Sequence, residues 1–230
     1  MKFSAVLAWA SLALAAPTPA AVEERDVIVI STFVSTVQKL ETTVKTQVDD
    51  IVSTAKITSN VDEIVSSVKG NLATIITAVT ESTGTIAQIA AASPADAIKG
   101  LKKADVKEVL VAVKSVNNIV SELKIAVSTI VKDVPSAVKT ALADEINQVK
   151  GLLWPFLQPV LTIVGAVENL ASSLGIKTDQ LVSALSLVLG LVNGILNLVN
   201  LPRFCKVVLE HELLSIGILN EVSEQVNGPV

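Results

Sequence analysis

The chain has 230 residues, of which 50% are hydrophobic, 3% are aromatic and 17% are charged, and its net charge is −4. This length suffices for one sizeable all-α domain or two small ones. The charged fraction lies below the roughly 25% that is usual in soluble domains, and no basic patch stands out, so the composition argues against a nucleic-acid partner. The apolar content is aliphatic, which indicates smooth apolar surfaces with few specific anchors.

Residues 1–15 have the pattern of a secretory signal peptide. Lys2 is a short basic region, residues 3–14 form an apolar region, and residues 13–15 offer a cleavage pattern of small residues. The apolar stretch is too short to span a membrane. Residues 16–25 contain two prolines and are interpreted as a disordered leader. We therefore expect a secreted protein, either extracellular or in the cell wall.

Residues 26–150 carry Val, Ile and Leu at spacings of three and four, the pattern of helices with one apolar face. Val, Ile and Thr favour strands, but a strand alternates over roughly 4–8 residues and this spacing persists for about 20 or more. The spacing predicts an all-α fold, a multi-helix bundle of long amphipathic helices. The first helix is expected over residues 26–56, with the apolar stripe Ile30, Phe33, Val37, Leu40, Val44, Val48, Ile51 and Ala55.

Three further helices are predicted in this amphipathic region. Ser59 or Asn60 is a candidate N-cap for the second helix, which Gly84 is expected to end. A third helix is expected over residues 104–132, and a fourth starts near Pro135. Their stripes are Val61, Ile64, Val65, Val68, Leu72, Ile75, Ile76 and Val79; Val106, Val109, Leu110, Val113, Val116, Val120, Leu123, Val127 and Ile130; and Val138, Leu142, Ile146 and Val149.

Residues 151–202 are the least charged part of the chain. Residues 151–167 and 180–202 contain no charge, and a polar connection, residues 168–179, lies between them. Two uncharged helices joined by a polar turn predict a hydrophobic C-terminal helical hairpin. Residues 203–230 are expected to form a C-terminal helical segment packed on the same domain.

Small and polar residues recur at spacings of three and four in the second uncharged stretch. Such a stripe lets a membrane helix pack tightly against a partner, or it is the part of an otherwise enclosed helix that meets water. Three asparagines are costly in lipid without partners, which favours the second interpretation. The stripe comprises Ser183, Ser186, Gly190, Asn193, Asn197 and Asn200.

The first uncharged stretch contains the run Trp154-Pro155-Phe156. Trp154 and Phe156 are candidates for an anchor at a lipid interface. Alternatively, the two aromatic side chains fill the core at a helix end. Pro155 cannot donate a backbone hydrogen bond, so a kink or break is expected there in either case.

No catalytic set is recognisable in the sequence. His211 is the only histidine and has no second ligand at a metal-binding spacing, so we predict no metal site, no cofactor and no Ser–His pair. Cys205 is the only cysteine, which excludes an internal disulfide. It is either a buried thiol or the source of an intermolecular disulfide. We expect no enzymatic activity.

Two segments carry a resemblance to a known family. The run VISTFVSTV at residues 29–37 and the helix over residues 62–80, which follow a leader ending in Glu24-Arg25-Asp26, resemble the fungal hydrophobic surface-binding protein A family, related to cell-wall mannoproteins. The resemblance covers residues 26–150 and rests on pattern and composition. It implies helical domains that adsorb to hydrophobic surfaces or hold lipid between helices.

We therefore expect a secreted, non-catalytic helical protein that binds lipids or hydrophobic surfaces. Two alternatives stay open: a pore-forming-like protein that inserts its hairpin into a membrane, and a structural, self-assembling cell-wall component. The expected partner is a lipid or a hydrophobic surface, and contact with a membrane or a homo-oligomer is left open. The residues expected to line an apolar ligand site are Leu157, Leu161, Val164, Leu185, Val188, Val192 and Leu196.

Overall fold

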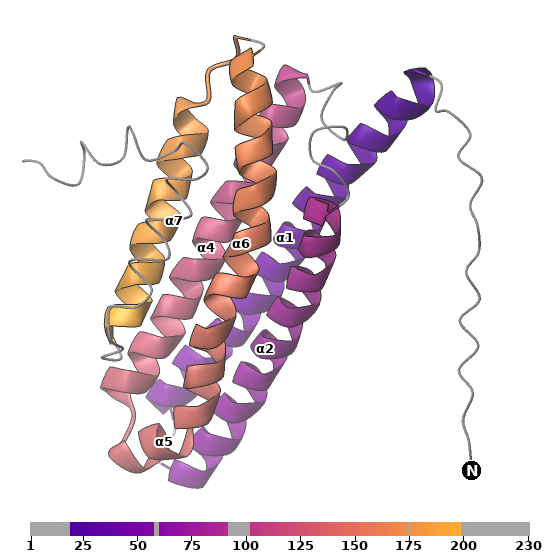
Figure 1. The fold of residues 1–230 in the computed structure, drawn as a ribbon. Helices are drawn as coiled ribbons and strands as arrows, with labels where there is room; N and C mark the ends of the chain where they lie inside the picture. Colours follow the sequence, from indigo (N-terminus) through magenta and orange to yellow (C-terminus); the bar gives the residue numbers. More distant parts are fainter. Residues whose placement is uncertain (1–18, 58–59, 92–101, 174, 199–230) are drawn as a thin grey trace, which may run out of the picture.

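The computed structural model describes residues 19–57, 60–91, 102–173 and 175–198, and these residues form an all-α bundle (Figure 1). No strand occurs within these ranges. The helices are α1 (Pro19–Ile57), α2 (Val61–Ala91), α4 (Lys103–Asp133), α5 (Ser136–Ala141), α6 (Ala143–Ser173) and α7 (Asp179–Leu198). The predicted signal peptide, Asn200, Cys205, His211 and the predicted C-terminal segment, residues 203–230, lie outside the described residues.

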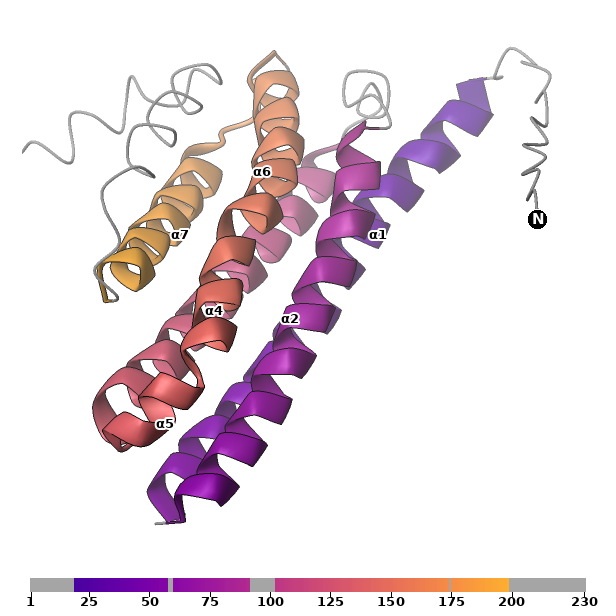
Figure 2. The same ribbon diagram turned by 60° about the horizontal axis from the view of Figure 1, so that its bottom comes forward.

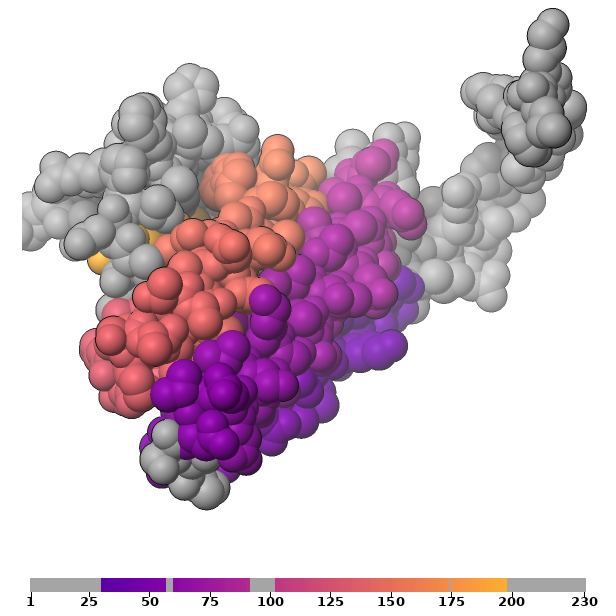
Figure 3. Space-filling model, turned by 90° about the horizontal axis from the view of Figure 1, so that it is seen from below, coloured from indigo at the N-terminus to yellow at the C-terminus, as the bar shows by residue number. Residues whose placement is uncertain are grey.

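The helices pack side by side in the order α7, α4, α1, α2 and α6. In Figures 1 and 2, α6 and α2 lie in front of α4 and α1, while α7 lies beside α6 on the side away from α2. The short helix α5 connects α4 to α6 and contacts α2. Seen from below, the end at which α1 gives way to α2 and the end at which α4 gives way to α5 lie next to each other (Figure 3).

The predicted apolar stripes form the core. Seven of the eight residues of the first stripe are at most 5% exposed, and Ala55 is half-buried. The predicted cap of the second helix is confirmed, since the Asp62 backbone N–H donates a hydrogen bond to Asn60 Oδ1 at 3.1 Å. Asp62 and Glu63 in the first turn of α2 also favour the positive end of the helix dipole.

Two predicted boundaries in the N-terminal half are wrong. Helix α1 begins at Pro19, so residues 19–25 are helical and do not belong to a disordered leader. Proline suits the first helical position, and the alanines and glutamates that follow are good helix formers. Helix α2 continues through Gly84 to Ala91. Gly84 is exposed, so it costs about 1 kcal/mol relative to Ala, while Ile86 beyond it is fully buried and holds the last turns in place.

Helix α6 differs from the prediction in three ways. The predicted fourth helix is divided at Leu142 into α5 and α6, although its stripe residues Val138, Leu142, Ile146 and Val149 are all buried as predicted. Of the kink or break expected at Pro155, the break does not occur, since α6 continues through Pro159. Buried residues on both sides, Leu153 and Phe156 among them, explain why the chain stays helical there.

The third difference lies at the C-terminal end of α6, which extends to Ser173 within the predicted polar connection. The helix then ends in a Schellman motif: Gly175 N–H donates to Ser172 O at 3.1 Å, and Ile176 N–H donates to Ala171 O at 2.9 Å. Gly175 has φ 68°, the left-handed conformation that the motif requires. This turn reverses the chain, so α6 and α7 run antiparallel as the predicted apolar hairpin (Figure 1).

Candidate functional site

Helix α7 is the apolar helix that is least enclosed by the bundle. It packs extensively on α4 but only sparsely on α6, whose main partner is α2. After Asp179 the helix carries no charge, yet only 39% of its most apolar stretch is buried. Leu187 is 63% exposed, the most exposed large hydrophobic residue in the described part of the chain. The two halves of the hairpin therefore rest mainly on other helices and only partly on each other.

The surface of α4 on which α7 packs, called here the seat of α7, is partly polar. Leu110 of α4 lies beside Leu181 of α7 in a small groove, and Lys124 of α4 lies over Gly194 of α7, where its Nζ is 3.1 Å from the position that a Cβ would take. Asn117 stands seven residues from each of Leu110 and Lys124, so it shares their helix face. Its Oδ1 is buried without a hydrogen-bond partner among the described residues. Such an atom costs about 1–3 kcal/mol, which weakens the attachment of α7.

The residues predicted to line a ligand site are close-packed. On α6 and α7, six of the seven are at most 3% exposed, and Leu196 is half-buried. All seven belong to the same core or pack against it, and neither groove described below includes them. The buried ones are Leu157, Leu161, Val164, Leu185, Val188 and Val192. A ligand can reach them only if helices of the bundle move apart.

Burial shows where the α7 stripe and the aromatic pair lie in this fold. Of the stripe, Ser183, Gly190, Asn193 and Asn197 are exposed, so in this fold the stripe faces water; Ser186 is half-buried and donates to Val182 O at 3.1 Å. Phe156 is 1% exposed and fills the core, which excludes it as an interfacial anchor in this conformation. Trp154 is half-buried against the core.

Two charged residues of α6 are buried, which the sequence analysis did not foresee. Glu145 accepts a hydrogen bond from Lys69 of α2 at 2.7 Å, and this bond lowers the pKa of Glu145 and raises that of Lys69. Lys150 is only 5% exposed, and its Nζ donates to Asn147 Oδ1 at 3.0 Å. Burial lowers the pKa of Lys150. The sequence does indicate the burial of Lys150, because this residue stands four residues after Ile146 and seven before Leu157, within the apolar stripe.

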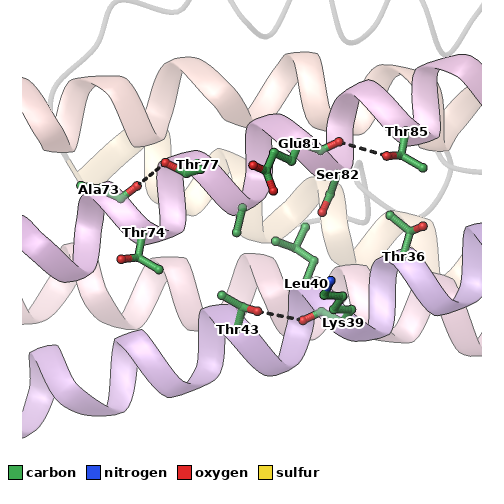
Figure 4. A pocket seen from close by; sticks show the side chains of 11 residues that line it. Thr36, Lys39, Leu40, Thr43, Ala73, Thr74, Thr77, Glu81, Ser82 and Thr85 are labelled. Carbon is green, nitrogen blue, oxygen red and sulfur yellow. Dashed lines mark hydrogen bonds between the residues drawn. The ribbon is translucent and has the colours of Figure 1, made fainter.

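A groove of about 610 Å³ separates the outer faces of α1 and α2 (Figure 4). Five threonine hydroxyls in its wall donate to the carbonyl oxygen four residues earlier, at 2.7–3.2 Å. The groove therefore presents hydroxyl oxygens and methyl groups, with Lys39 and Glu81 as its charged residues. It is lined by Thr36, Lys39, Leu40, Thr43, Ala73, Thr74, Thr77, Ala78, Glu81, Ser82 and Thr85.

A second groove, of about 260 Å³, lies where α4 and α7 begin. Helices α4 and α7 run in the same direction, so both N-termini lie at this end of the bundle (Figure 1). The floor of the groove is apolar and its rim carries three lysines and one aspartate. It is lined by Lys103, Val106, Lys107, Leu110, Ile176, Lys177, Thr178, Asp179, Gln180 and Leu181.

Within the described residues, no three His, Cys, Asp or Glu side chains gather to hold a metal ion. Two described helices, α6 and α7, are long and apolar enough to cross a membrane by length and composition. Half of the most apolar stretch of α6 is buried, as in the core helix of a soluble protein. Comparison of the chain with protein-family models, with curated proteins and with solved structures gives no match.

Proposed function

We propose that this protein is a secreted, non-catalytic helical protein that binds lipids or hydrophobic surfaces through α7 and the apolar seam beneath it. The observation that carries the proposal is the unusual position of α7. Only 39% of its most apolar stretch is buried, Leu187 protrudes into solvent, and Asn117 on the same face of α4 has an Oδ1 atom without a hydrogen-bond partner among the described residues. An apolar helix that packs mainly on one neighbour gains by contact with another apolar phase.

The free energy of α7 differs between water and a lipid surface. Transfer of apolar area out of water is worth roughly 25 cal/mol per Å², and the exposed side of α7 forgoes this gain in water. On a lipid surface, Leu187 and the half-buried Leu191 beside it on the helix face would be covered. If α7 lifted further, Leu185, Val188 and Val192 on its own buried face would also become available to acyl chains.

The proposal includes the signal-peptide interpretation of residues 1–15 and hence a location outside the cell or in the cell wall. It also includes the resemblance of residues 26–150 to hydrophobic surface-binding protein A. Both rest on the sequence pattern. The polar outer faces of α1 and α2 are compatible with a protein that stays soluble until α7 meets an apolar surface.

The test compares two variants that add the same charge to different sides of α7. Leu187→Asp places a carboxylate on the exposed apolar side, and Asn193→Asp places one on the polar stripe. Because burying a leucine is worth about 1.5–3 kcal/mol, we expect Leu187→Asp to weaken binding to phosphatidylcholine vesicles or oil droplets about tenfold or more. Asn193→Asp should bind like the wild type. Equal binding by all three proteins would remove the basis of the proposal.

Membrane insertion is the second candidate, because α6 and α7 are both long and apolar enough to span a bilayer. Release of a dye trapped in vesicles separates the two functions. A protein that binds at the surface takes up lipid without leakage, whereas an inserting hairpin releases the dye. A self-assembling cell-wall component would instead form concentration-dependent oligomers without lipid.

A further inference from the structure

The groove between the starts of α4 and α7 combines a positive rim with an apolar floor. Lys103 and Lys107 stand four residues apart on α4 and so share a helix face, and Lys177 approaches from the loop before α7. All three lysines are exposed, and Asp179 is the one carboxylate in the lining. Positive charge therefore exceeds negative charge around this groove.

The fold adds to this positive potential. The N-termini of α4 and α7 lie at the same end of the bundle, and each contributes the partial positive charge of its helix dipole. The dipoles alone would not make a site. Here they reinforce three lysine side chains placed around a groove that already exists.

The floor of the groove is suited to hydrocarbon. Val106 and Leu181 are 7% and 2% exposed, and Leu110 and Ile176 are half-buried beside them. The groove measures about 260 Å³, below the roughly 300–1,000 Å³ of pockets that enclose a whole small molecule. It has room for a head group and the start of a chain. Leu110 continues the floor into the α4–α7 seam, towards Asn117.

We propose that this groove binds the anionic head group of a single-chain lipid, with Lys103, Lys107 and Lys177 around the head and the acyl chain entering the α4–α7 seam. The inference rests on the proposed function and specifies its ligand class and point of entry. A carboxylate or phosphate head suits the three ammonium groups, and the chain would take over the contacts that α7 now makes with α4. Entry at the shared N-terminal end would lift α7 from its partly polar seat.

The experiment titrates the full secreted chain with three probes by calorimetry, below their micelle-forming concentrations. Palmitate carries both head and tail, hexadecanol carries the tail with a neutral head, and acetate carries the head alone. We expect palmitate to bind about tenfold more tightly than hexadecanol, since several exposed ion pairs contribute together. Acetate at the same concentrations should give no signal.

Two triple variants with the same change in net charge assign the effect to the groove. Lys103→Gln/Lys107→Gln/Lys177→Gln should lose the tenfold preference for palmitate and keep its affinity for hexadecanol. The matched control replaces three exposed lysines elsewhere and should retain the preference. Its substitutions are Lys45→Gln, Lys56→Gln and Lys132→Gln.

The outcomes separate this inference from the proposed function. If palmitate and hexadecanol bind the wild type equally, or if the preference survives the groove variant, the head-group site is wrong while lipid binding stands. If the control variant loses the preference as well, net charge and not the groove is responsible. If acetate binds as tightly as palmitate, the groove is an anion site without a lipid. If neither long-chain probe binds, the proposed function fails and this inference fails with it.

Discussion

Two leucines in the uncharged stretches, Leu157 and Leu187, offer a direct test of the packing. Leu157 is 1% exposed and Leu187 is 63% exposed. Truncating a buried leucine to alanine removes its transfer free energy and leaves a cavity, at a cost of about 2–5 kcal/mol. For Leu157→Ala we expect about 3 kcal/mol, which lowers Tm by about 6–12 °C in a domain of this size.

Leu187→Ala is the matched control, because it makes the same chemical change on the neighbouring helix. Leucine and alanine have similar helix propensities, and an exposed substitution usually changes stability by less than about 0.5 kcal/mol. Thermal unfolding followed by circular dichroism at 222 nm measures both variants. Equal losses of Tm, or a larger loss for Leu187→Ala, would refute the assignment of α6 to the core and of the exposed side of α7 to the surface.

Three further outcomes follow from single positions. Lys150→Met should unfold at a higher denaturant concentration than the wild type near neutral pH. Because folding lowers the pKa of Lys150, the stability of the wild type should rise with pH as pH approaches 10.5. The same rise in the variant would contradict the burial of this amine. Glu145→Gln should abolish the part of acid denaturation that comes from the ion pair with Lys69. Folding lowers the pKa of Glu145, so the ion pair stabilises the fold above the ordinary pKa of 4.5, and this stabilisation is lost as pH falls through the pKa of the folded state. Unchanged acid sensitivity in the variant would contradict this ion pair. Gly175→Ala should cost about 1 kcal/mol in urea unfolding through backbone strain alone, since no atom lies within 4 Å of the added Cβ; a neutral result would contradict the left-handed turn.

The helices and their buried faces could be predicted from the sequence because the apolar spacing extends over many turns. The stripe from Ile30 to Ile51 is buried as predicted, and the cap at Asn60 follows from a side chain that bonds the first turn. Helix breaks were harder to predict. Gly84 and Pro155 carry a local cost, but tertiary packing of Ile86 and of Phe156 outweighs it.

The candidate site could be predicted only in part. The absence of charge in residues 151–167 and 180–202 marked both stretches as unusual, but it could not show which neighbours they pack on. The side chains of Leu157 and Leu185 are enclosed by neighbouring helices and the rest of the core. The lysine-rimmed groove joins Lys103 to Lys177, which lie far apart in the sequence, so only the parallel arrangement of α4 and α7 reveals it.

The most direct test of the central claim, that α7 is the weakly held helix that meets lipid, is hydrogen exchange of the backbone amides followed by mass spectrometry. In the absence of lipid, residues 179–198 should exchange faster than residues 30–57 of α1, because α7 packs mainly on one neighbour through a partly polar seat, which favours local opening. On addition of phosphatidylcholine vesicles, exchange should change in α7 and in the part of α6 beside it, while α1 and α2 keep their rates. Slow exchange in α7 that equals that of α1 and is unaffected by vesicles would contradict the account.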